Sequence, residues 1–233
     1  MRRLLFALIA LVILAVAADF VAARLVEQRI ANELAATYQL NREPVVRVRD
    51  FPFLLSLARR RFGTVDVAAH DVRARGVNAA QLEVHLHDVV VPSEVFQGRR
   101  APIQVGWADG QLRLSERELN RLVGGRLRGG RVELTGSGVR ISVRTQILGR
   151  PVQATVTGRL TANGNRLSFN PTNVELDGDA AQLDQATRAR VAELFRFTAE
   201  LPPLPAGVRV ERVDTEPDAL ILSGRAGAIQ VPT

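Results

Sequence analysis

The chain has 233 residues, 46% of them hydrophobic, which suffices for one large domain or two small ones with a packed core and excludes a disordered chain. It has no cysteine, which excludes disulfides, thiol catalysis and cysteine metal sites. The net charge of +7 suits anionic partners, but aromatic residues make up only 5% of the chain and an export signal is present, so we expect no nucleic-acid binding.

The N-terminus has the pattern of a targeting segment. Two arginines precede an uncharged apolar run from Leu4 to Ala18, in which Ala15 to Ala17 resemble a cleavage site. Phe20 to Ala23 extend the run past one acidic residue toward the roughly 20 residues of a membrane span. We therefore expect export to the periplasm or cell envelope, with residues 1–23 as a cleaved signal peptide or a retained anchor, and residues 24–233 as a single domain.

An amphipathic helix is predicted next, from Arg24 to Tyr38, because apolar side chains recur there every four residues. Asn41 to Pro44 interrupt this pattern. The alternation from Val46 to Arg49 then predicts a short strand.

The segment FPFLLSLARRRFG, Phe51 to Gly63, predicts a short helix with Pro52 in its first turn. We expect Asp50 or Phe51 to cap this helix, and Gly63 to stop it after Arg61. Its apolar and basic residues are segregated along the segment. That order suits an apolar pocket with a charged mouth, although an ordinary core face is the alternative.

Most of the remaining chain alternates apolar and polar residues, which predicts strands. The alternating regions are Thr64 to Pro92, Ile103 to Leu114, Val139 to Leu160, Val208 to Val213 and Ala219 to Ile229. Such strands form a mostly antiparallel sheet with one apolar face that needs a cover.

Two further helices are predicted among these strands. Ser115 and Glu118 form a capping box, and Gly124 is placed for a left-handed C-terminal cap. A second helix starts at Asp179 and carries an apolar stripe as far as Thr198, so it is the natural cover for the sheet. The fold class is therefore α+β.

No set of residues in the sequence requires catalysis or a cofactor. His85 and His87 should project from one side of a strand, but spacing dictates no third ligand, so we expect no metal site. Asp177 and Asp179 are explained by a turn and a helix cap. Nucleophile-elbow, zinc-protease, phosphate-loop and dinucleotide motifs are missing from the sequence. We therefore expect that the protein is not an enzyme.

Three stretches of the sequence, together with the apolar leader, resemble one known family. They are VEQRIANELA, VRVRDFPFLLSLARRRFGTVDVAAHDV and LPPLPAGVRVERVDTEPDALILSG. They resemble the LmeA-like phospholipid-binding family of actinobacterial cell-envelope proteins over nearly the whole chain, although Asp50 stands where members commonly have glycine. The resemblance implies a non-enzymatic lipid binder whose curved, mostly antiparallel sheet wraps around amphipathic helices and forms an apolar groove, as in tubular lipid-binding proteins.

The candidate site residues belong to two sets. The candidate groove residues are Phe51, Phe53, Leu54, Leu57 and Phe62, joined by Val191, Leu194 and Phe195 from the later helix. The candidate headgroup residues are Arg59, Arg60 and Arg61, because guanidinium groups pair well with phosphate oxygens. Core packing for the apolar set and a solvated surface for the arginines are the competing interpretations.

The expected function is to hold or transfer anionic phospholipid in support of envelope lipid or lipoglycan assembly. Its expected partners are phospholipid, the membrane surface and envelope biosynthesis proteins. The alternative is a non-catalytic structural or adaptor protein that docks onto a membrane-bound envelope enzyme.

Overall fold

The computed structural model describes residues 2–74, 76–124, 130–147, 150–164, 166–176, 190, 192–193, 195–200 and 207–231. Its helices are α1 (Arg2–Tyr38), α2 (Phe53–Arg59), α3 (Ser93–Phe96) and α4 (Glu116–Val123). The first strands are β1 (Val45–Val48), β2 (Arg61–Ala74), β3 (Val77–Val90), β4 (Ile103–Ser115), β5 (Arg131–Thr135) and β6 (Gly138–Ile147). They are followed by β7 (Arg150–Asn163), β8 (Arg166–Leu176), β9 (Phe197–Glu200), β10 (Arg209–Glu216), β11 (Ala219–Ala226) and β12 (Ile229–Val231).

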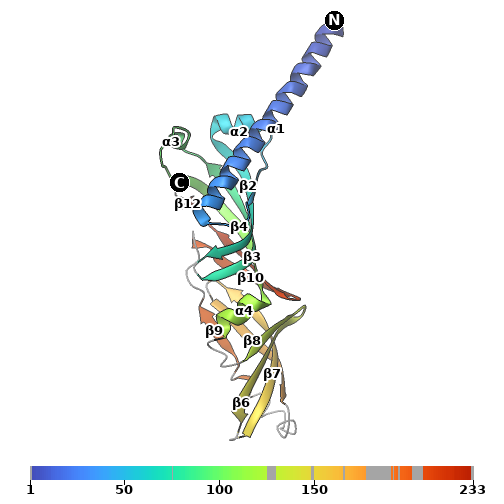
Figure 1. The fold of residues 1–233 in the computed structure, drawn as a ribbon, viewed down its shortest axis with the longest axis vertical. Coiled ribbons are helices and arrows are strands. Elements are labelled where there is room, and N and C mark those ends of the chain that lie inside the picture. The colour runs from blue at the N-terminus through green and yellow to red at the C-terminus, as the bar shows by residue number, and fades with distance from the viewer. Residues whose placement is uncertain are drawn as a thin grey trace. The chain divides into compact units, whose positions relative to one another are not determined.

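The strands form two open, curved sheets (Figure 1). The larger sheet has the order β1-β2-β3-β4-β11-β10, and β12 pairs with β4. The smaller sheet has the order β5-β6-β7-β8-β9. All the registers that the structure describes are antiparallel, for example Val46 opposite Val67. The predicted α+β class with a mostly antiparallel sheet is therefore confirmed.

Contacts divide the chain into two compact units. The first unit comprises Met1–Asp71, Leu82–Gly110 and Ala226–Thr233, and the second comprises Val72–Gln81 and Gln111–Arg225. The expectation of a leader followed by one domain stays a prediction.

Helix α1 organises the core of the first unit. Its first half is exposed and projects beyond the strands of that unit (Figure 1), whereas its second half buries Glu27 and Ala31. Half-buried Val26, Ile30 and Leu34 pack on the same core. The four-residue spacing that predicted this part of the helix therefore describes its buried face.

The second unit has its own apolar core between the β5–β8 strands, α4 and the β10–β11 hairpin. Val156 and Phe169 are fully buried there, on the adjacent strands β7 and β8. Gly158 lies at a bulge in β7, and a Cβ atom there would meet the Phe169 ring at 2.6 Å and the Asn170 carbonyl oxygen at 2.5 Å. Only glycine fits this close approach.

Some predicted element boundaries are wrong. α2 ends at Arg59, with Arg60 in the left-handed conformation, and Gly63 lies inside β2. Gly124 ends α4 with right-handed helical angles. The predicted last helix does not reach Thr198, which lies in β9, and its start at Asp179 lies outside the described residues.

Candidate functional site

The start of α2 is held by a side chain from α1. The carboxylate of Asp19 accepts hydrogen bonds from the backbone N–H groups of Phe53 at 2.8 Å and Leu54 at 2.7 Å, and only 5% of Asp19 is exposed. A carboxylate in this position satisfies two free N–H groups of the first helical turn. The expectation that Asp50 or Phe51 caps α2 is therefore wrong.

Asp50 instead holds the start of β2. Its carboxylate accepts hydrogen bonds from the N–H of Gly63, at 2.8 and 3.0 Å, and from the N–H of Thr64 at 3.3 Å. A glycine in place of Asp50 would lack this acceptor, so the side chain fixes the loop that joins α2 to the sheet.

Two candidate groove residues lie in the core of the first unit. Phe53 is 1% exposed, Phe62 is buried, and their ring centroids are 5.9 Å apart. Leu57 is half-buried and packs against the same core. These three side chains hold α2 on the sheet.

Two other candidate groove residues point to the surface. Phe51 is 64% exposed and Leu54 is 43% exposed, and Leu55 beside them is 45% exposed. The Phe51 ring lies 6.0 Å from the ring of Phe20 on α1. The apolar segment therefore has a buried side and an exposed side.

Of the three later candidates, only Phe195 is among the described residues. Val191 and Leu194 lie outside the described residues. Phe195 is half-buried against the core of the second unit, whereas Phe51 to Phe62 belong to the first. Over its described residues the structure does not show the expected apolar groove, which stays a prediction.

The candidate headgroup residues are all exposed, and one of them borders a hollow. Arg61 lines an open pocket of about 450 Å³ in the first unit. The other lining residues are Asp88, Val90, Gln104, Val105, Gly106, Ala228, Ile229 and Gln230. This mixture of an arginine, an aspartate, two side-chain amides and apolar walls offers donors for a phosphate or a polyol, an acceptor for hydroxyl groups, and contact for carbon atoms.

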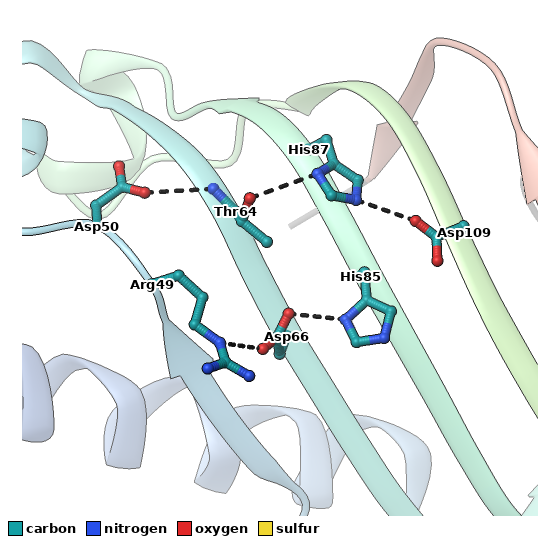
Figure 2. A network of polar contacts seen from close by, with 7 residues as sticks. All are labelled: Arg49, Asp50, Thr64, Asp66, His85, His87 and Asp109. Carbon is teal, nitrogen blue, oxygen red and sulfur yellow. Dashed lines mark hydrogen bonds and ion pairs between the residues drawn. The ribbon is translucent and has the colours of Figure 1, made fainter.

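The sequence interpretation did not foresee a polar network that crosses β2, β3 and β4 (Figure 2). Asp66 accepts a hydrogen bond from Arg49 and hydrogen-bonds Nδ1 of His85 at 2.8 Å. His87 lies between Asp109, 3.0 Å from Nε2, and Thr64, 3.4 Å from Nδ1.

The two histidines do project from one side of β3, as the alternation predicts. Their partners could not be found from the sequence, because they depend on which residues of neighbouring strands lie opposite each other. The ring of Trp107 stacks on His87 with centroids 3.6 Å apart.

One carboxylate of this network, that of Asp66, pairs with the Arg49 guanidinium. Burial alone would raise the pKa of Asp66, but hydrogen bonds from His85 and Arg49 outweigh it and hold the pKa below the ordinary value of a carboxyl group. Within the described ranges, no group of three or more His, Asp or Glu side chains is placed to hold a metal ion. These side-chain contacts join β2, β3 and β4 beside the loop that carries Asp50.

The chain was compared with protein families, with curated proteins and with solved structures. The model of the family described as LmeA-like phospholipid-binding matches residues 17–225. The chain belongs to this family. No curated protein and no solved structure matched the chain.

Membership in the LmeA-like family spans both units and begins inside α1. The family is a lipid-binding, non-catalytic one. In this LmeA-like chain, the match includes Asp19, the whole α2 segment and Arg61. It leaves out residues 1–16 and the part of the Arg61 hollow formed by Ala228, Ile229 and Gln230.

Proposed function

We propose that this protein binds anionic phospholipid in the cell envelope and holds or transfers it during envelope lipid or lipoglycan assembly, without catalysing a reaction. The match of residues 17–225 to a phospholipid-binding family carries the proposal. The helix Arg2–Tyr38 supports an exported location, because it is long and apolar enough to cross a membrane and has arginines at its start.

The Arg61 hollow is our proposed headgroup site. Its volume of about 450 Å³ is in the range of about 300–1,000 Å³ found for small-ligand sites. Arg61 would pair with the phosphate, and the amides of Gln104 and Gln230 would hydrogen-bond the alcohol part of the headgroup. Arg59 and Arg60 would add attraction to the anionic surface from which the lipid comes.

Lipid uptake by the full chain tests the proposal. Detergent-extracted protein is mixed with labelled phosphatidylglycerol, and bound lipid is counted by native mass spectrometry. We expect one lipid per chain, and about tenfold weaker uptake in Arg61→Gln, because a charge-assisted hydrogen bond contributes roughly 1.5–3 kcal/mol. Arg47→Gln, an exposed arginine on β1, is the matched control.

Two results would contradict this function. Protein that takes up no labelled lipid would remove the lipid-binding role. Uptake that falls equally in Arg61→Gln and Arg47→Gln would remove the headgroup site and leave only a general effect of charge.

The second candidate is an adaptor that docks onto a membrane-bound envelope protein. The exposed apolar side chains of Phe51, Leu54 and Leu55 favour it, because such a patch suits a protein partner as well as lipid. A photocrosslinker at Leu55 would then recover one defined envelope protein, with no lipid bound to the purified chain.

A further inference from the structure

Asp19 is the only charged residue between Leu4 and Ala23. Its side chain is nevertheless not exposed on the surface of α1. Its carboxylate is buried, and both its oxygens accept N–H groups from α2. A hydrogen-bonded carboxylate costs far less to remove from water than a free one. The capping contact therefore lowers the free-energy cost of placing Asp19 within a longer apolar segment.

With that charge satisfied, the apolar segment has the length of a bilayer span. Leu4 to Ala23 comprise twenty helical residues, which extend about 30 Å at 1.5 Å each. This equals the thickness of a bilayer hydrocarbon core, about 30 Å. The described side chains before Asp19, residues 2–18, are all exposed.

The same contact places α2 beside the last turns of that segment (Figure 1). Phe20 and Val21 on α1 and Phe51, Leu54 and Leu55 around α2 are all exposed, with Phe20 next to Phe51. The apolar surface therefore continues from α1 onto α2. Arg59, Arg60 and Arg61 follow at the far end of α2, where the apolar surface ends.

We propose that the leader is retained as a membrane anchor and that Asp19 holds α2 as a wedge, with Phe51, Leu54 and Leu55 buried in the outer leaflet of the bilayer. This inference extends the proposed function. It rests on that function in one respect, that the protein acts at a membrane. It brings the Arg61 hollow to the level of lipid headgroups, so that lipid can enter the protein without crossing water.

The bilayer is the occupant that this surface fits. The patch continues a helix that is itself long and apolar enough to cross a membrane. It is bordered by three exposed arginines, which complement anionic headgroups. Apolar side chains next to arginines are the pattern of a segment lying in a membrane interface.

Depth-dependent fluorescence quenching tests the wedge. The full chain, with its single tryptophan replaced in Trp107→Phe, is inserted into vesicles of phosphatidylcholine and phosphatidylglycerol brominated on the acyl chains. We expect quenching of Phe51→Trp and Leu55→Trp to exceed that of Tyr38→Trp at least about twofold, because interfacial apolar faces lie about 5–10 Å deep.

Tyr38 is the matched control. Like Phe51 it is aromatic and largely exposed, at 61%. It lies on α1, the helix that carries Asp19, but nineteen residues beyond Asp19, or about 28 Å along the helix axis. Equal quenching at positions 51, 55 and 38 would overturn the wedge. Using two reporter positions keeps the test valid if one variant fails to fold.

Intact-mass measurement tests the retained anchor. We expect the membrane-extracted chain to keep its apolar leader, whereas a released chain that begins near Ala18 would overturn the anchor. Lipid uptake and quenching together separate this inference from the lipid-binding role. Arg61→Gln should reduce lipid uptake without changing the quenching at positions 51 and 55.

Discussion

At the scale of single residues, two aspartates determine how the FPFLLSLARRRFG segment is attached to the first unit. Asp19 caps α2 from 34 residues away, and Asp50 ties down the start of β2. Both use carboxylate oxygens to satisfy backbone N–H groups, which otherwise cost free energy when buried. The segment is therefore held at both ends by charged side chains, and its Phe53 ring is buried in the core.

We predict that Asp19→Ala loosens α2 without unfolding the first unit. Losing a helix cap costs about 0.5–2 kcal/mol, and the amides of Phe53 and Leu54 lose their acceptors. Hydrogen exchange should become faster at these two amides. Asp19→Asn, which keeps one acceptor oxygen, should recover part of the protection, and unchanged exchange in both variants would show that the cap is not needed.

Truncation of Phe53 should destabilise the protein far more than truncation of Phe51. Phe53→Ala removes a buried ring and should lower the free energy of unfolding by about 3–5 kcal/mol. Phe51→Ala, at an exposed position, should change it by less than about 0.5 kcal/mol. Denaturant titration measures both. A stable Phe53→Ala protein that no longer takes up lipid would instead place Phe53 in a lipid groove.

At the scale of elements, α4 forms only one of the two hydrogen bonds that its capping-box motif predicts. The side chain of Ser115 accepts a hydrogen bond from the N–H of Glu118 at 3.3 Å, as the capping box predicts. The carboxylate of Glu118 does not bond back to Ser115. It accepts from the backbone of Asn78 at 2.8 Å, from the Asn78 side chain at 3.1 Å, and from Arg121. The helix is therefore fastened to β3.

This fastening should depend on pH. The hydrogen bond from Arg121, opposed by burial and aided by Asn78, lowers the pKa of Glu118 to about 2. The stabilisation is complete above the ordinary value near 4.5 and is lost as the pH falls from there toward 2. We predict that this loss destabilises the protein by about 2–3 kcal/mol, reduced where Arg121 is exposed to water.

Glu118→Gln provides the comparison for the pH dependence, which is measured by denaturant titration between pH 6 and pH 2. The variant should be less stable at pH 6 and should lose less stability on acidification than the natural chain. Parallel curves for the two proteins would show that Glu118 does not cause the acid sensitivity.

At the scale of the whole molecule, a basic chain carries an apolar N-terminal helix and a small basic patch. The net charge is +7, and the arginines next to the proposed wedge are exposed. Charge attraction to a lipid surface is screened by salt, whereas apolar insertion is not. The two contributions can therefore be separated by ionic strength.

We predict that the anionic-lipid preference of the full chain falls with salt, while its association with neutral vesicles does not. Replacing Arg59 and Arg60 together by Gln should weaken the anionic preference by about 1 kcal/mol for each arginine. Vesicle flotation at low and high salt measures it. The control replaces exposed Arg29 and Arg47, and an equal loss there would assign the preference to net charge alone.

Much of the fold could be predicted from local pattern. The alternation of apolar and polar residues predicted β1 to β4, β6, β7, β10 and β11, because the period of a strand depends only on its own side chains. The exact ends of α2 and α4 could not be predicted in this way. Gly63 was expected to stop α2 after Arg61, but α2 ends at Arg59, Arg60 takes the left-handed conformation, and β2 begins at Arg61.

By itself, the sequence determined the α+β class, the apolar N-terminal segment and the family, because each of these depends on local periodicity or on short sequence motifs. Only the tertiary structure decided which side of the Phe51–Phe62 segment is buried, which carboxylate caps α2, and which partners His85 and His87 have. These depend on contacts between residues far apart in the chain, such as Asp19 with Phe53, and no local pattern records them.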